Sequence, residues 1–425
     1  MITVLQWKRT SVRLHTGPTA SPGAPRTFTY LRDVRVAVAL LSLSAVAFGF
    51  TYSDHAPLIP LVSADFRLDD LGAGLLSTAL FTSYMFTTLV TTGLAERLGP
   101  KRMVGAGLAV SAVGTIAFAA SPNYAVALAA KAIQGVGSAL AFVAAARYLA
   151  GLYGDRRNHF ALGLYGGGFP LGSALALLAM PPLAAALGGW RGAFWAEAAF
   201  VSTAALAWWR APSVSRVARP GSIRDALRCA NCWLASLQHA AGFGMAIASG
   251  TWVTVYLLRE FRLPLELSGL LGSLLLVLAV LARPIGGLLL AREHLPTRRV
   301  MRIGDLAIVA GVVLLAIPDR PLALALGGAA LVGIGVGLPY SAVFNTAAAS
   351  LPTAPGAAQG LAAIGGTAGV MIGAPAMGYA VQTYGFWAAW FFVGLVSAIA
   401  LVGTAFMHGE EDLPGGGSAP ADPRP

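Results

Sequence analysis

Residues 71–102 decide the fold, and they read LGAGLLSTALFTSYMFTTLVTTGLAERLGPKR. Residues 71–94 contain no charged side chain, and about 20 apolar residues are enough to cross the hydrocarbon core of a bilayer as a helix. One acidic residue, Glu96, and three basic residues then follow before residue 103. A run of this length that ends in a basic segment indicates a transmembrane helix followed by a loop.

The same pattern recurs along the chain. Of the 425 residues, 56% are hydrophobic and 11% are charged, whereas soluble domains contain roughly 25% charged residues. Because these runs lack strict alternation, they cannot be membrane barrel strands, and we predict an all-α membrane protein with twelve transmembrane helices. The predicted spans are residues 36–60, 71–94, 103–120, 124–150, 159–187, 192–209, 233–258, 266–291, 301–317, 322–348, 357–382 and 386–407.

The spans divide into two sets of six. Residues 211–231 form the longest predicted cytoplasmic connection, between an N-terminal bundle at 36–210 and a C-terminal bundle at 232–407. The halves echo each other, because Gly74-Leu75-Leu76 precedes Gly93 much as Gly269-Leu270-Leu271 precedes Gly287. Internal repeats are how many transporters build a site between two bundles. Outside the bundles, we expect disordered tails at residues 1–35 and 408–425.

The basic residues indicate the orientation. With both termini in the cytoplasm, most of the 29 Lys and Arg residues fall in the tails and cytoplasmic loops. This excess predicts a multi-pass protein of the plasma (inner) membrane with both termini cytoplasmic. The basic residues are scattered between apolar runs, so we expect no nucleic-acid binding. The basic residues predicted on the outer side are Arg67, Arg191, Arg259, Arg262 and Arg320.

The segment Gly93-Leu94-Ala95-Glu96-Arg97-Leu98-Gly99-Pro100-Lys101-Arg102 resembles the signature between the second and third helices of the major facilitator superfamily. Glu96 stands where that family usually has Asp, and Thr92 where it usually has Gly. The resemblance covers residues 36–407 and implies two six-helix bundles and secondary transport by alternating access. The alternative role for the basic residues is to anchor the topology. The gating loop that the resemblance implies comprises Gly93, Glu96, Arg97, Gly99, Lys101 and Arg102.

Two charged residues inside the spans suggest proton coupling. Lys131-Ala132-Ile133-Gln134-Gly135 resembles a family segment that normally opens with Arg, and Asp54 lies in the first span. Both charges lie about 10 Å from the outer surface at about 1.5 Å per residue, and charges in lipid are normally paired. Asp54 and Lys131 are therefore the candidate coupling pair. Alternatively, Asp54 is solvated at the outer end of its span.

Other polar residues in or near the spans have more than one possible role. We interpret His55 as an interfacial or packing residue, and Glu197 with Trp190-Arg191 as boundary and topology residues. Arg283 is either a structural residue of the second-half loop network or a cation that faces the substrate. Each of the other mid-span polar and aromatic residues has the alternative role of a helix–helix contact. The candidate lining of a central cavity is Tyr84, Gln134, Gln238, His239, Trp252, Arg283, Tyr340 and Asn345.

The leading hypothesis is a proton-coupled carrier of a small solute. Lys131 and Arg283 are intramembrane cations, so we favour a small organic or inorganic anion. A multidrug/proton antiporter is the alternative, although Gly168 replaces the proline expected in the fifth-helix antiporter segment. A non-transporting sensor or scaffold would need a signalling domain, and none is visible. We find no metal cluster, nucleophile elbow or phosphate loop, so we expect neither an enzyme nor a cofactor, and we expect a monomer in the lipid bilayer.

Overall fold

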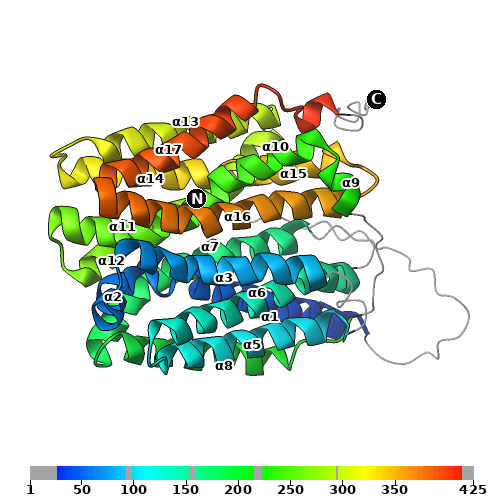
Figure 1. Ribbon diagram of the computed structural model, residues 1–425. Coiled ribbons are helices and arrows are strands. Elements are labelled where there is room, and N and C mark those ends of the chain that lie inside the picture. The colour runs from blue at the N-terminus through cyan, green and yellow to red at the C-terminus, as the bar shows by residue number, and fades with distance from the viewer. Residues whose placement is uncertain (1–25, 92–97, 154–158, 215–222, 293–294, 414–425) are drawn as a thin grey trace, which may run out of the picture.

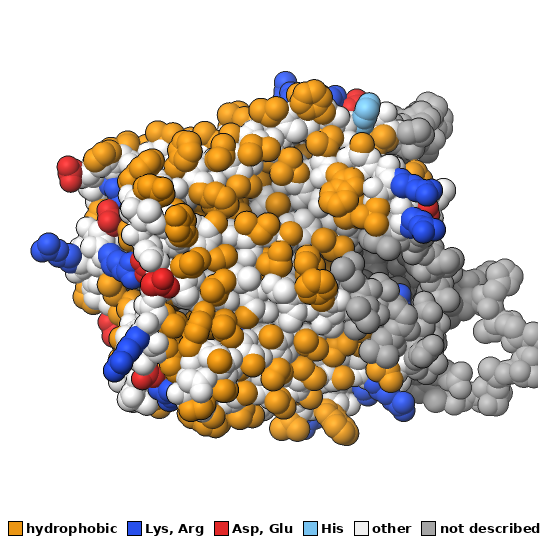
Figure 2. Space-filling view, viewed as in Figure 1, with side chains coloured by type: hydrophobic (Ala, Val, Ile, Leu, Met, Phe, Trp, Pro, Cys, Tyr) orange, Lys and Arg blue, Asp and Glu red, His pale blue; other side chains and the backbone are white. Residues whose placement is uncertain are grey.

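Every regular element that the structure describes is a helix. A computed structural model describes residues 26–91, 98–153, 159–214, 223–292 and 295–413. The long helices lie side by side along roughly one axis (Figure 1). On the face shown in Figure 2, hydrophobic side chains cover the middle and charged side chains gather toward the two ends. This distribution suits a protein that crosses a membrane, where helices satisfy all their backbone hydrogen bonds internally.

Eight helical elements make up the described part of the first half. We call the end of the bundle that holds the start of α1 the terminal end, and the opposite end the distal end (Figure 1). The elements are α1 (Arg26–Ser53), η1 (Ala56–Leu58), α2 (Ile59–Phe66), α3 (Asp70–Thr91), α5 (Pro100–Ala119), α6 (Tyr124–Tyr153), α7 (His159–Ala186) and α8 (Trp190–Trp208).

The second half repeats this arrangement and ends at the terminal end. Its elements are α9 (Ile223–Leu227), α10 (Ala230–His239), the π-helical turn η2 (Ala240–Gly244), α11 (Met245–Phe261), α12 (Leu265–Arg292), α13 (Thr297–Ala316), α14 (Leu322–Gly337), α15 (Tyr340–Ser350), α16 (Pro355–Tyr384), α17 (Phe386–Gly403) and η3 (Glu410–Asp412).

Each predicted span coincides with a helix or a broken helix. Within the described residues, nine helical segments are long and apolar enough to cross a membrane. The remaining predicted spans correspond to α3, α8 and α13, which have 22, 19 and 20 residues and are packed in the same bundle. The α13 sequence contains Arg298, Arg299, Arg302 and Asp305, so its mean hydropathy is lower. The fold is consistent with twelve crossings.

Three boundaries differ from the sequence-based prediction. α1 begins at Arg26, inside the predicted tail, because hydropathy marks only the part of a helix that lies in hydrocarbon. α9 and the start of α10 fall inside the predicted central loop. Beyond α17, the Glu411 carboxylate accepts hydrogen bonds from the backbone N and Oγ1 of Thr297, at 3.0 and 2.9 Å. An acidic group at the N-terminus of α13 is favourable for the helix dipole, so this part of the predicted tail is ordered.

Three of the crossings are broken near their middle. α1 stops at Ser53 and the chain resumes as η1, whose second residue is Pro57. The π-helical turn η2 separates α10 from α11, and Pro339 lies between α14 and α15. Proline and π turns interrupt the regular hydrogen-bond ladder, and broken helices mark the binding sites of many transporters.

The two halves meet tightly at the distal end. α3 packs on α16, and α12 packs on α7. A methyl group added to Gly74 would lie 2.7 Å from the carbonyl oxygen of Ala374, and one added to Gly269 would lie 2.5 Å from that of Leu177. The two glycines of the sequence repeat therefore occupy equivalent contacts between the halves.

An ion pair adds to this distal contact. Both Nη atoms of Arg259, on α11, donate to the Asp70 carboxylate at the start of α3, each at 2.7 Å. Nearer the terminal end, α10 and α15 pack mainly against other elements of the second half. In this conformation the distal end is the closed one.

Candidate functional site

A buried ion pair occupies the break in the first crossing. Asp54 lies between α1 and η1, and its Oδ1 contacts the Nζ of Lys131 on α6. Both side chains are completely buried, so the structure excludes the alternative in which Asp54 is solvated. The predicted match in depth brings the two residues together. Their coupling role stays a prediction.

Further hydrogen bonds satisfy this pair. Lys131 Nζ donates to the carbonyl oxygen of Thr51 at 3.3 Å. Gln134 Nε2 donates to Asp54 Oδ2 at 3.3 Å and to Thr115 Oγ1 at 2.9 Å. The lysine ammonium also lies 5.0 Å from the ring centroid of Phe118, within range of a cation–π interaction. Buried charges need such partners, because their desolvation otherwise exceeds the Coulomb gain.

His55 links the ion pair to the second half. Its Nδ1 lies 3.0 Å from Asp54 Oδ1, and its Nε2 lies 3.0 Å from Ser77 Oγ. Ser77 Oγ is in turn 3.4 Å from Thr251 Oγ1 on α11. His55 is fully buried with polar contacts at both ring nitrogens, so the interfacial alternative is wrong.

Glu197 was not among the coupling residues predicted from the sequence. The structure buries it to 1% exposure on α8, which corrects its interpretation as a boundary residue. It interacts electrostatically with Asp54 and Lys131, and we call Asp54, His55, Lys131 and Glu197 the charged cluster. Glu197 lies one helical turn after Phe194, whose ring centroid lies 5.7 Å from Lys131 Nζ, so the two side chains share the helix face that turns toward the lysine. Arg191, by contrast, is 41% exposed and pairs with Asp65, as expected of a boundary residue.

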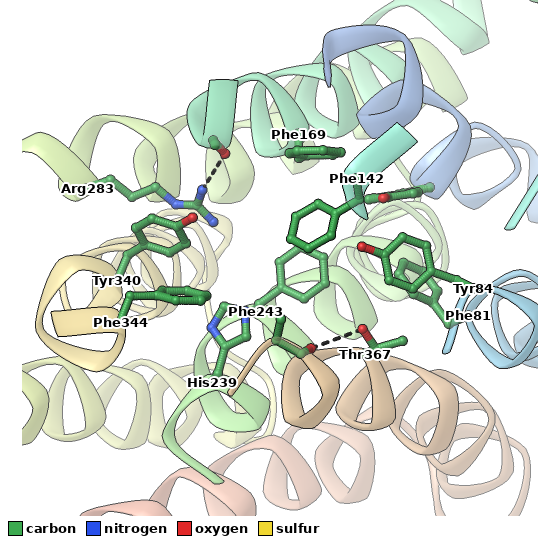
Figure 3. Close-up of a pocket in the computed structure, with 13 residues that line it drawn as sticks. Phe81, Tyr84, Phe142, Phe169, His239, Phe243, Arg283, Tyr340, Phe344 and Thr367 are labelled. Carbon is green, nitrogen blue, oxygen red and sulfur yellow. Dashed lines mark hydrogen bonds between the residues drawn. The ribbon is translucent and has the colours of Figure 1, made fainter. Parts of the chain in front are cut away.

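A cavity of about 50 Å³ lies between the halves, and we call it the central cavity. Aromatic rings supply most of its wall (Figure 3). Its polar groups include one guanidinium and one imidazole from the second half, and its described lining contains no Asp or Glu. The lining residues are Tyr52, Phe81, Tyr84, Phe142, Gly166, Phe169, His239, Phe243, Arg283, Tyr340, Phe344, Ala363 and Thr367.

The helix breaks aim several of these side chains inward. His239 directly precedes the turn η2 and Phe243 lies within it, and the two rings stack with centroids 5.5 Å apart. Tyr340 and Phe344 follow the break at Pro339 and are one turn apart, with centroids at 4.9 Å.

Arg283 has an unused hydrogen-bond donor at the central cavity. Its Nη1 donates to the carbonyl oxygen of Gly166 on α7 at 2.8 Å, which crosses between the halves. The guanidinium carbon lies 4.1 Å from the ring centroid of Tyr340 (Figure 3), and Nε has no partner among the described residues. Of the two roles left open by the sequence, the structure places Arg283 where it can face a solute.

Four of the predicted cavity residues line the central cavity: Tyr84, His239, Arg283 and Tyr340. The other four lie elsewhere, which corrects their assignment. Gln134 serves the charged cluster. Gln238 donates to Asp305 Oδ2 at 3.0 Å and to the carbonyl of Ala400 at 2.7 Å, and so ties α10 to α13 and α17.

The remaining two face away from the cavity for different reasons. Trp252 Nε1 donates to the carbonyl oxygen of Ala374 at 2.9 Å, and its fully buried ring packs α11 against α16. Asn345 is exposed. It follows Phe344 by one residue, and adjacent helical residues point about 100° apart. Polarity at mid-span does not reveal which helix face turns inward.

The predicted gating loop is described in part. Gly93, Glu96 and Arg97 lie outside the described residues. Gly99 precedes α5 with φ of 81°, a conformation that favours glycine. Lys101 Nζ donates to the carbonyl of Trp209 at 3.3 Å and fastens α5 to the end of α8, while Arg102 is exposed. The gating role of this loop stays a prediction.

Comparisons with known proteins agree with this architecture. The sequence model of the Major Facilitator Superfamily matches residues 41–352 and 234–424. The chain is 28% identical over 287 residues to the probable nitrate/nitrite antiporter NarK1 of Thermus thermophilus, which covers 59% of this chain and 63% of that relative. It is 27% identical over 117 residues to the probable anion transporter 2, chloroplastic, of Oryza sativa subsp. japonica, covering 27% of this chain and 22% of the relative.

Solved structures share the fold. The nucleoside transporter NupG superposes with a TM-score of 0.72 at 14% identity and covers 88% of this chain and 99% of its own. A bacterial homologue of the lysosomal transporter Spinster, in an inward-facing conformation, has a TM-score of 0.70 at 16% identity and covers 90% and 97%. At these identities the likeness concerns the fold alone. With the family match spanning both halves, the chain belongs to the Major Facilitator Superfamily and has the fold of its multi-pass membrane transporters.

Proposed function

We propose that the protein is a proton-coupled secondary transporter of a small anion. The observation that carries the proposal is the guanidinium of Arg283 in the central cavity. Arg283 and His239 face it, and its described lining contains no carboxylate. A desolvated guanidinium with unused donors favours a carboxylate, nitrate or similar oxyanion, because charge-assisted hydrogen bonds are the strongest that it can form. The names of the two anion-transporting relatives support the same class of solute.

The protons act at the charged cluster, apart from the solute. Asp54 is ionised while Lys131 contacts it, and it takes up a proton when the lysine moves away during the transport cycle. The path from His55 through Ser77 to Thr251 supports this role, because it joins the cluster to the second half. In a bacterial plasma membrane the terminal end would face the cytoplasm. The closed distal end would then face the outside of the cell.

The multidrug antiporter is the alternative function. The aromatic wall of the central cavity would suit apolar drugs, but cationic drugs require an acidic group, and none lines the described cavity. The two functions predict opposite ligand charges. The distinction can therefore be made by binding.

The experiment measures thermal stabilisation of purified protein by nitrate, benzenesulfonate and a cationic dye. The two anions should stabilise the wild type. Arg283→Gln should weaken their binding about 10- to 150-fold, since a hydrogen bond to a charged group contributes about 1.5–3 kcal/mol. Arg262→Gln is the matched control, because Arg262 is exposed and lies away from the cavity. Stabilisation by the dye alone, unchanged in Arg283→Gln, would contradict the proposal.

A further inference from the structure

The carboxyl of Glu197 has no role in the coupling scheme above, yet it is buried inside the charged cluster. Its side chain is 1% exposed. Neither Oε1 nor Oε2 has a hydrogen-bond partner among the described residues. The groups that act on it electrostatically are Asp54 and Lys131. A carboxyl so placed must be either an uncompensated charge or a neutral acid.

The charges of the neighbours decide between these two states. Lys131 Nζ contacts Asp54 Oδ1, so the lysine charge is already matched. His55, the remaining titratable member of the cluster, faces Asp54 and Ser77. α8 packs against α5, α1 and α7, and on α5 the neutral Thr115 accepts a hydrogen bond from Gln134, which in turn donates to Asp54. A second carboxylate here would lack both a counter-charge and hydrogen bonds, and such desolvation costs several kcal/mol.

We propose that Glu197 holds the coupled proton in the distal-closed conformation, so that the coupling site is two carboxyls sharing one lysine. The inference rests on the proposed proton-coupled function and places the proton within it. In this conformation Asp54 is the carboxylate, Lys131 is the ammonium and Glu197 is the neutral acid. The cluster then has no net charge, which suits its complete burial.

Loss of the proton has a structural consequence. When the O–H bond of Glu197 breaks and the proton passes to water, two carboxylates face one ammonium, and the cluster carries one negative charge. Lys131 is then attracted toward both acids, which weakens its contact with Asp54. Because Asp54 also holds His55, which reaches Thr251 through Ser77, the change is transmitted to the contact between the halves. Proton occupancy thereby favours one conformation over the other.

The first test is infrared difference spectroscopy of purified protein at neutral pH. Asp305 is also a buried carboxyl, so the spectrum of Glu197→Gln is subtracted from that of the wild type. The difference should contain the carbonyl stretch of one protonated carboxylic acid. Glu266→Gln, which alters an exposed glutamate, should keep this band. Because glutamine has the shape and charge of the neutral acid, Glu197→Gln should unfold at or above the wild-type temperature. A difference spectrum without that carbonyl band, or a clear loss of stability in Glu197→Gln, overturns the inference.

The second test uses proteoliposomes and measures the uptake of labelled nitrate and of labelled benzenesulfonate. Glu197→Gln should lose accumulation driven by a pH gradient and keep counterflow, which needs no proton cycle. Glu197→Asp, which retains the acid, should recover part of the accumulation. If the wild type accumulates neither probe, the proposed function fails. If the wild type is coupled and Glu197→Gln is equally coupled, only the inference about Glu197 fails.

Discussion

The close approach of the two halves at Gly74 can be perturbed by a single methyl group. In Gly74→Ala, the new Cβ would lie 2.7 Å from both the Ala374 carbonyl oxygen and the Cα of Pro375. Favourable separations of carbon atoms are about 3.5–4.0 Å, so the halves must move apart at this point. The contact partners belong to the other half, and the substitution therefore acts on the distal-closed conformation.

The size of the effect follows from this geometry. Overpacking of a tight contact costs about 1–3 kcal/mol. Alanine also stabilises a helix by up to about 1 kcal/mol relative to glycine. This gain is the same in both conformations, so it cancels from the free-energy difference between them. The ratio of distal-closed to distal-open protein should therefore fall about 5- to 150-fold, since about 1.4 kcal/mol is a factor of ten. Gly269→Ala should act in the same direction, because its Cβ would lie 2.5 Å from the Leu177 carbonyl oxygen.

The assay is a distance distribution between two spin labels at the distal end. Labels on cysteines at Ala64 of α2 and Glu266 of α12 report on the two halves, and both positions are exposed. The free native thiols, Cys229 and Cys232, are first replaced by serine. Gly74→Ala should increase the long-distance population. Gly327→Ala is the control, because a methyl group there meets nothing within 4 Å. A distribution in Gly74→Ala that matches the control would refute the assigned contact.

Three further predictions concern orientation, gating and pH dependence. A reporter fused at Pro220 should read as cytoplasmic and one at Arg320 as external, and the opposite pattern would overturn the orientation. Replacing Gly93 with a bulky residue should lower the transport rate more than solute affinity; a loss of affinity with unchanged turnover would refute the gating role. Lys131→Ala should shift the pH profile of transport toward alkaline values, because Asp54 keeps its proton to higher pH without a counter-charge, whereas an unshifted profile would separate the lysine from coupling.

Much of the fold could be predicted because membrane-spanning helices require long apolar runs, and basic loops between these runs mark the cytoplasmic side. Apolar runs and basic loops located the helices, and the repeat that includes Gly74 and Gly269 indicated two related halves. The contact that each glycine makes with the other half is known from the structure. The pairing of Asp54 with Lys131 followed from depth alone, since two opposite charges at one level of a bilayer are stabilised by meeting.

The solute site was harder to predict for a physical reason. An apolar ring inside a span is favourable whether it faces lipid, another helix or a cavity, so Phe142 and Phe169 carry no distinguishing signal. The π-helical turn η2 orients His239 and Phe243. It contains no proline, so the sequence shows no sign of a helix break there. Glu197 lies close to Arg191 in sequence, but the helix turns one toward the core and the other outward.

The most direct test of proton-coupled transport compares wild type with Asp54→Asn in proteoliposomes. Accumulation of labelled nitrate and benzenesulfonate is driven by an imposed pH gradient, and counterflow is measured in the same vesicles. Asp54→Asn should lose uphill accumulation and keep counterflow, because the solute site at Arg283 is separate from the charged cluster. Uphill accumulation by Asp54→Asn at the wild-type level, with an unchanged pH profile, would contradict the account.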